Sequence, residues 1–231
     1  MDVIIRLLLA HIVGDFFLQS KSCCEAKRER TVKGFFMSGF HSLVIAILSY
    51  LVVADWSCWW IPVVLLLSHW LIDIIKSWHE DESASSFLLD QLAHIILIGV
   101  ISFCYMGCPK LEYDAFSTVN LLYLLSYLLV LKPSSIIIKL FTQQWAPKET
   151  SKISLPNAGK WIGYLERVLI LTFIFVGHVE GIGFLLAAKS IFRFGDLNKS
   201  KDVRTTEYVL LGTFMSFAIS ILIGFGVKWL I

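Results

Sequence analysis

The sequence predicts an all-α membrane protein, a polytopic helical bundle with about seven or eight transmembrane helices. Of its 231 residues, 57% are hydrophobic and only 16% are charged, and the mean hydropathy is +0.73. A soluble domain has about a quarter of its residues charged. Several apolar stretches here reach the roughly 20 residues that cross a bilayer core. This composition excludes disordered, collagen-like and disulfide-scaffold proteins, and the net charge of +2 gives no support for a nucleic-acid partner.

Eight apolar segments follow one another along the chain, at residues 2–20, 35–54, 58–78, 87–107, 118–141, 159–177, 181–194 and 207–230. The first has no basic cluster before it and no cleavage site after it, so we expect a membrane helix and not a signal peptide. The seventh is short and the fifth contains Lys132-Pro133, so one of them can be kinked, re-entrant or interfacial. We divide the chain into a four-helix membrane half (1–107), a fifth helix with its cytoplasmic connection (108–157) and C-terminal membrane helices (158–231).

Lysine and arginine are concentrated in alternate loops, those that follow the first, fifth and seventh segments. The opposite loops contain essentially Lys110 alone. The positive-inside rule therefore places the basic loops in the cytoplasm and both termini outside. Tryptophans then fall at the outer interface, where amphipathic rings are expected: Trp56, Trp59, Trp60 and Trp229.

Ionisable residues inside the front four segments are the most informative feature, because each costs several kcal/mol in a bilayer and invites a functional interpretation. Three segments carry a histidine and an aspartate four residues apart, which places both side chains on one helical face. The second segment adds a single histidine. The pairs are His11 with Asp15, His69 with Asp73, and Asp90 with His94, and the single residue is His41.

The depth of these residues is an independent argument. At a rise of about 1.5 Å per residue, the carboxylates lie about 5 to 7 Å from the predicted cytoplasmic helix ends and the imidazoles about 9 to 13 Å. The order within the pair is reversed on the segment that runs in the opposite direction. We therefore expect all seven side chains in one slab of the inner leaflet.

Imidazoles and carboxylates at one depth are typical of a divalent metal site, for which zinc is expected first and manganese or iron are alternatives. All seven residues are candidate ligands, of two ions, or of one ion with aspartates that orient its ligands. The three aspartates are also candidate catalytic bases. Two alternatives stay open, namely hydrogen bonds that hold the helices together and a metal-free proton relay.

Further polar residues toward the cytoplasmic side are candidates for substrate binding. An arginine fork matches the oxygens of a phosphate or carboxylate. The alternatives are structural ion pairs between the C-terminal helices and a snorkelling lysine at position 76. The candidates are Gln19, Lys76, Glu166, Arg167, Lys189 and Arg193.

The motifs H-x-x-x-D-F-x-x-Q at 11–19, H-x-x-x-D at 69–73 and D-Q-x-x-H at 90–94 resemble those of the bacterial integral membrane family called domain of unknown function 3307. Residues 159–167 (GKWIGYLER) and 183–194 (GFLLAAKSIFRF) are similar to the later part of longer members. The resemblance covers most of the chain. It implies a prokaryotic or phage-encoded inner-membrane protein, and it supplies no substrate or activity.

The leading functional hypothesis is a metal-dependent hydrolase whose site opens to the cytoplasm and acts on a lipid or lipid-linked substrate. The sequence lacks H-E-x-x-H, G-x-S-x-G and a phosphate-binding glycine loop, so the common protease, lipase and P-loop classes are not supported. A divalent-cation or proton-coupled transporter is the alternative, and a non-catalytic structural membrane subunit is the third. The lipid bilayer is the one expected partner, and the oligomeric state is left open.

Overall fold

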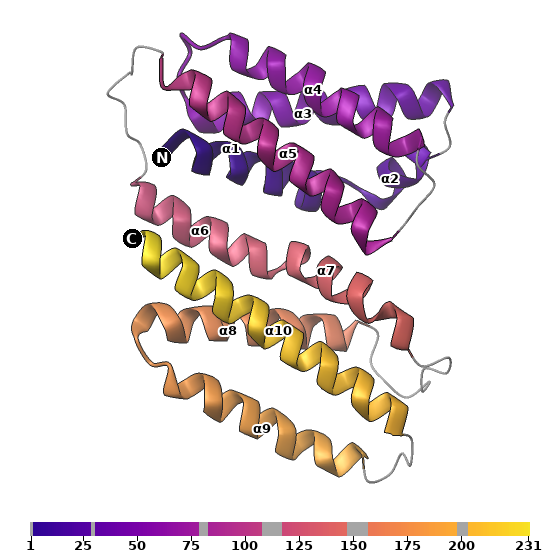
Figure 1. The fold of residues 1–231 in the computed structure, drawn as a ribbon, viewed down its shortest axis with the longest axis vertical. Helices are drawn as coiled ribbons and strands as arrows, with labels where there is room; N and C mark the ends of the chain where they lie inside the picture. The colour runs from indigo at the N-terminus through magenta and orange to yellow at the C-terminus, as the bar shows by residue number, and fades with distance from the viewer. Residues whose placement is uncertain (1, 29–30, 79–82, 108–116, 147–156, 198–202) are drawn as a thin grey trace. The chain divides into compact units, whose positions relative to one another are not determined.

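The computed structural model describes residues 2–28, 31–78, 83–107, 117–146, 157–197 and 203–231. Within these residues every regular element is helical, which confirms the all-α prediction. The elements, labelled in Figure 1, are α1 (Asp2–Ile12), the π-helix η1 (Val13–Leu18), α2 (Lys21–Arg28), α3 (Val32–Val53), α4 (Trp60–Trp78), α5 (Ala84–Tyr105), α6 (Thr118–Val130), α7 (Lys132–Thr142), the 3-10 turn η2 (Gln143–Trp145), α8 (Ala158–Val176), α9 (Glu180–Leu197) and α10 (Val203–Leu230).

Five helical segments of the described chain are long and apolar enough to cross a membrane. They are Val32–Val53, Trp60–Ser77, Ala84–Tyr105, Thr118–Trp145 and Arg204–Leu230. The predicted segments 2–20, 159–177 and 181–194 are also helical, as α1 with η1, α8 and α9, but they are not among these five. The length and composition of these five helical segments are those of membrane spans, which supports the prediction of a membrane protein.

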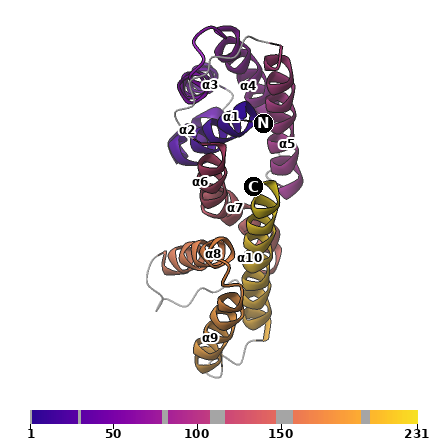
Figure 2. The ribbon, with the colours of Figure 1, turned by 90° about the vertical axis from the view of Figure 1, so that its left-hand side faces the viewer.

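The structure divides the chain into two compact units, Met1–Leu125 and Ser126–Ile231, here called unit 1 and unit 2. In unit 1, α1 lies beside α3 and α5, α4 packs on α3 and α5, and α2 packs on α3. Both views of the ribbon show α1 next to α3 and α5 (Figures 1 and 2). The apolar core at one end of unit 1 comprises Leu7, Val53, Cys58, Ile61, Leu65, Ile98 and Ile101.

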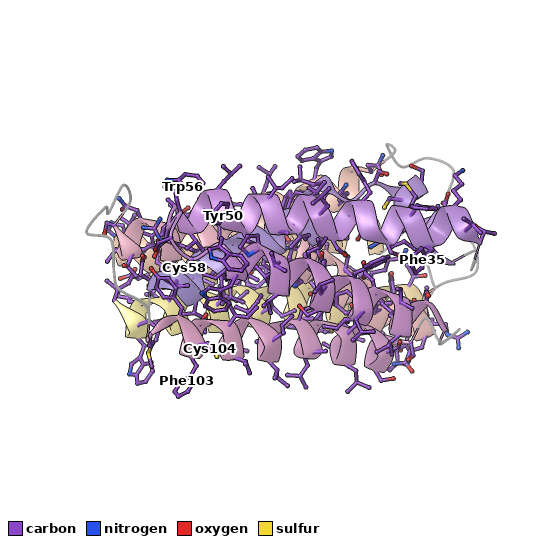
Figure 3. The ribbon with its side chains drawn as sticks, turned by 90° about the horizontal axis from the view of Figure 1, so that it is seen from above. Phe35, Tyr50, Trp56, Cys58, Phe103 and Cys104 are labelled. Carbon is purple, nitrogen blue, oxygen red and sulfur yellow. The ribbon has the colours of Figure 1, made fainter. Side chains whose placement is uncertain are left out.

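The helices of unit 1 run in alternating directions, so their ends meet in two groups. Figure 3 places Tyr50, Trp56, Cys58 and Cys104 near one end of the unit and Phe35 at the other. The end with Trp56 also contains Asp55, which is buried and accepts hydrogen bonds from the Ser57 hydroxyl at 2.5 Å and the Tyr105 hydroxyl at 2.7 Å. The α3–α4 connection is therefore fixed by polar contacts at this end.

Unit 2 is built on α10, which packs against α7 and α8, while α9 packs on α8. Its core contains Ile170, Ile174, Ile182 and Phe217. The fifth predicted segment is broken at Leu131, between α6 and α7, and Pro133 occupies the first turn of α7. Proline has no N–H and cannot continue the ladder of the preceding turn. The Lys132-Pro133 pair thus interrupts the fifth segment, as its proline predicts.

Candidate metal centre

Asp15 lies in η1, the six-residue π-helix that continues α1. The N–H of Gln19 donates to the carbonyl of Gly14 at 3.1 Å, which closes the wider π-helical turn. Such turns are rare and occur frequently at functional sites. Here the π-helix places the Asp15 carboxylate opposite α3 and α4.

Asp15, His41 and His69 form a compact triangle of polar atoms, which we call the Asp15 triangle. The distance from Asp15 Oδ1 to His41 Nε2 is 3.0 Å, and that from Asp15 Oδ1 to His69 Nε2 is 3.2 Å. The two Nε2 atoms are 3.4 Å apart. One residue comes from each of η1, α3 and α4, so three helices converge on the triangle.

The edges of the Asp15 triangle match the spacing of ligands around one metal ion. Zinc lies about 2.0 to 2.1 Å from imidazole nitrogen and carboxylate oxygen, so neighbouring ligand atoms are about 3.0 Å apart in octahedral and about 3.3 Å apart in tetrahedral coordination. The observed edges of 3.0, 3.2 and 3.4 Å fall close to these values. Two imidazoles and one carboxylate are also a known donor set for iron, with positions left open for other ligands.

His11 and His94 lie next to the triangle. His11 Nδ1 is 3.8 Å from Asp15 Oδ2, and its Nε2 is 3.4 Å from Gln91 Oε1. The His94 ring stacks on His11 with centroids 4.9 Å apart and meets His69 edge-on at 4.3 Å. The four imidazoles are thus in one cluster, which is nearly sealed, since each is at most 5% exposed.

The two other aspartates of the predicted set are held by lysines. Lys27 of α2 forms an ion pair with Asp73. Lys76 lies 2.5 Å from Asp90, which also accepts from the Gln91 amide at 3.1 Å. Two groups of three residues each have ligand atoms that all lie within 4.8 Å of one another. One group is His11, Asp15 and His69, and the other is His41, His69 and Asp73. Asp73 therefore borders the triangle from α4.

The model of a family described as protein of unknown function (DUF3307) matches residues 3–140, more than half of the chain. The chain belongs to this family. No curated protein and no solved structure matches the chain.

The DUF3307 match contains all seven predicted histidines and aspartates together with Gln19, Lys27 and Lys76. It ends before residues 159–167 and 183–194, so the similarity proposed for those segments lies outside it. In this DUF3307 chain, all the residues around the triangle belong to unit 1.

The four predicted residues of the C-terminal helices belong to unit 2, and three of them, Glu166, Arg167 and Lys189, have partners there. Lys189 lies 2.5 Å from Glu166, and Arg167 donates to the carbonyl of Val130 and to Ser135 and Ser216. Within unit 2 these residues thus form one ion pair and several hydrogen bonds. The side chain of Arg193, in α9, lies outside the described part of the chain.

Three features of the site were not predicted from the sequence: Lys27, Gln91 and the π-helix. The concentration of Lys and Arg after the first segment predicts a loop there, but Cys23, Ala26 and Lys27 are buried at helical spacing on α2. With the Gln19 amide oriented to suit its neighbours, Gln19 accepts from Lys27 Nζ at 2.8 Å and donates to the Asp15 carbonyl at 3.3 Å. The helical spacing of 23, 26 and 27 was the available signal for α2.

Proposed function

We propose that this DUF3307 chain is an integral protein of the bacterial inner membrane with a His/Asp metal site that faces the cytoplasm. We further propose that it is a metal-dependent hydrolase of a lipid or lipid-linked substrate. The observation that supports the metal most directly is the Asp15 triangle, whose edges are close to the distances between neighbouring ligands of one ion. Zinc is the first candidate, and manganese or iron are alternatives.

In this proposal Asp15, His41 and His69 hold the ion, and His11 lies beside them as a further ligand. An ion there would activate a water molecule for attack and polarise a carbonyl or phosphoryl oxygen. Asp73 has ligand-forming atoms near His41 and His69, so it is the aspartate placed to accept a proton from that water. Asp90 is held by Lys76 and supports α5 against α4.

The membrane arrangement belongs to the same proposal. In this arrangement the five candidate spans together with α1, α8 and α9 would make eight crossings, an even number that leaves both termini outside. The basic loops then lie in the cytoplasm. Lys76, whose side chain is 44% exposed, lies at the end of the site that this arrangement places toward the cytoplasm, where it is paired with Asp90. A phosphate-bearing headgroup is the substrate chemistry that would suit its ammonium group together with the ion.

The experiment is a hydrolysis screen over phospholipids and polyprenyl phosphates with metal-loaded protein, followed by Asp73→Asn. A hydrolase predicts that Asp73→Asn keeps most of the metal and loses about 100-fold in turnover, the usual scale for a positioned base. Asp55→Asn, at the opposite end of unit 1, is the matched control and should keep full turnover.

The transporter alternative makes a different prediction for the same variant. A carboxylate that binds and releases the transported ion changes ion affinity and flux together when it becomes an amide. If no lipid is cleaved by the wild type while Asp73→Asn alters ion affinity and flux in parallel, the hydrolase proposal is wrong.

A further inference from the structure

The orientation of His94 leaves one of its ring nitrogens for another partner. Its Nδ1 lies 2.9 Å from the backbone carbonyl of Asp90, one turn earlier on α5. A carbonyl oxygen only accepts hydrogen bonds, so Nδ1 carries the proton and donates it. In the neutral ring Nε2 therefore presents a lone pair, and this is the atom that faces away from the helix backbone.

Nε2 of His94 is buried and has no hydrogen-bond partner among the residues that the structure describes. His94 itself is only 2% exposed. Buried polar atoms are paired with protein groups or with ordered water in nearly all cases. A partner for Nε2 is therefore expected within reach of the ring.

A small cavity adjoins this ring. It measures about 10 Å³ and is lined by His11, His69 and His94 together with Ser49 and apolar side chains. That volume is about what one water molecule requires, and a buried water needs two to four polar partners. His94 Nε2 and the Ser49 hydroxyl provide two, whereas the apolar part of the wall closes the cavity.

We propose that His94 holds a water molecule in this cavity through Nε2 and is not a ligand of the ion. Among the described residues, two groups have ligand atoms that all lie within 4.8 Å of one another. Their histidines are His11, His41 and His69, and neither group contains His94. Since His69 belongs to both the Asp15 triangle and the cavity wall, the water lies beside the ion site. If this water is the one that attacks the substrate, that role rests on the proposed function. The binding of the water by His94 does not depend on the proposed function.

His94 is then a positioning residue with a fixed tautomer. Its ring is held by the Asp90 carbonyl, by stacking on His11 and by the edge contact with His69. Lys76 in turn fixes the Asp90 side chain at 2.5 Å. Rotation of the ring away from the cavity would break the hydrogen bond to the Asp90 carbonyl and both ring contacts.

The test is ¹⁵N NMR of detergent-purified protein with labelled histidines, first without metal and then with ¹¹³Cd²⁺. Without metal, the His94 ring should be protonated at Nδ1 and show magnetisation transfer from water. With ¹¹³Cd²⁺, coupling to the ion should appear on His41 and His69 and not on His94. Assignments come from single His→Gln variants.

Binding affinities provide a second measurement. His94→Gln and His94→Phe should change Cd²⁺ affinity by less than about 3-fold, whereas His69→Ala should lose 10-fold or more, as expected for loss of a ligand. His94→Phe should also abolish the water contact of the neighbouring rings, because phenyl fills the cavity without a hydrogen-bonding atom.

Coupling of ¹¹³Cd to His94 would overturn the inference, and so would a His94 ring that is protonated at Nε2 alone or receives no magnetisation from water. If no histidine couples to ¹¹³Cd, the metal proposal fails instead. The tautomer and the water contact in the metal-free protein still decide the inference in that case.

Discussion

At the scale of single residues, the Asp15 carboxylate connects η1 to α3 and α4. One of its oxygens lies within 3.2 Å of two imidazole nitrogens that come from α3 and α4. A carboxylate oxygen accepts two such bonds when the rings are protonated at Nε2, and the same three atoms can share an ion once those protons leave. The geometry is therefore compatible with both the ion-free and the loaded site.

Substitution Asp15→Asn tests this link. The amide is neutral and directs either a weaker acceptor or an NH₂ group at the two rings, so metal affinity should fall by 10-fold or more. Competition with a chelating dye measures it. Asp55→Asn is the matched control, and an equal loss in both variants would show that the effect is not local to the triangle.

Asp55, in the connection between α3 and α4, has a pKa that is set by two opposing effects. Burial raises the pKa, but hydrogen bonds from Ser57 and Tyr105 favour the ionised form and lower it below its usual value. Because the folded pKa is depressed, the stabilisation is complete above the unfolded pKa of about 3.9 and is lost as pH falls through the folded pKa.

We therefore expect the wild type to lose stability between pH 5 and pH 3 more steeply than Asp55→Asn. Tyr105→Phe, which removes a hydrogen bond to a charged group, should lower the free energy of unfolding at pH 7 by about 1.5 kcal/mol. Unfolding in detergent followed by circular dichroism measures both. Identical pH slopes in the wild type and Asp55→Asn would contradict this assignment.

At the scale of the elements, the long helices were predictable because each carries a continuous apolar stretch of bilayer length. The predicted segments 35–54, 58–78 and 87–107 agree closely with α3, α4 and α5. The short α2 was missed because its apolar face comprises only a few residues, among them Cys23 and Ala26. The π-helix was also missed, since a change from four-residue to five-residue hydrogen bonds leaves no clear mark in composition.

The break between α6 and α7 depends on Arg167 of α8. Pro133 cannot donate to Leu129, whose carbonyl accepts instead from the Ser134 hydroxyl at 2.7 Å. Arg167 donates to the next carbonyl, that of Val130, and to Ser135 at 2.6 Å. One guanidinium thereby satisfies the backbone that the break leaves open.

Arg167→Met should therefore lower the free energy of unfolding by about 3 kcal/mol, since it leaves buried carbonyl and hydroxyl groups without donors. Lys139→Met, at an exposed position of α7, is the control and should cost less than about 0.5 kcal/mol. Thermal unfolding of the two purified variants measures the difference. Equal melting temperatures would show that the network is not stabilising.

The docking of α2 depends on Gly34, at the start of α3. A Cβ atom at this position would lie 2.5 Å from the carbonyl oxygen of Ala26. Gly34→Ala should thus displace α2 and weaken the Lys27–Asp73 ion pair, at a cost of about 1 to 3 kcal/mol.

Gly99→Ala in α5 is the matched substitution, because no atom lies within 4 Å of its Cβ position. It should be neutral or stabilising by up to about 1 kcal/mol, the helix propensity of alanine over glycine. Hydrogen exchange of α2 should increase in Gly34→Ala alone. Unchanged exchange in that variant would mean that α2 tolerates the added methyl group.

At the scale of the whole molecule, the sequence predicted which residues share a depth but not how they pair. Four-residue spacing determines the helical face on which His11, His69 and His94 lie. It does not tell which carboxylate a given imidazole contacts, because that depends on the rotation and tilt of helices far apart in the chain. The pairing of Asp15 with His41 and His69, rather than with His11 of its own helix alone, follows from the packing of η1 against α3.

The orientation of the protein is a further prediction at this scale. In a cysteine-free variant, Ser22→Cys should react with a membrane-impermeant thiol reagent only from the cytoplasm, and Trp56→Cys only from outside. Both positions are exposed in the structure, whereas the native Cys23 is buried. Reversed labelling would place the site at the outer face.

If unit 1 holds a metal ion at the Asp15 triangle, elemental analysis of detergent-purified protein should find it. We predict about one or two transition-metal ions per chain in the wild type, none or far fewer in His41→Ala and His69→Ala, and an unchanged content in the control His178→Ala, which alters an exposed histidine of unit 2. A folded and active wild type without metal would show that the triangle does not hold an ion and would leave a proton relay or structural hydrogen bonds as the function of the cluster.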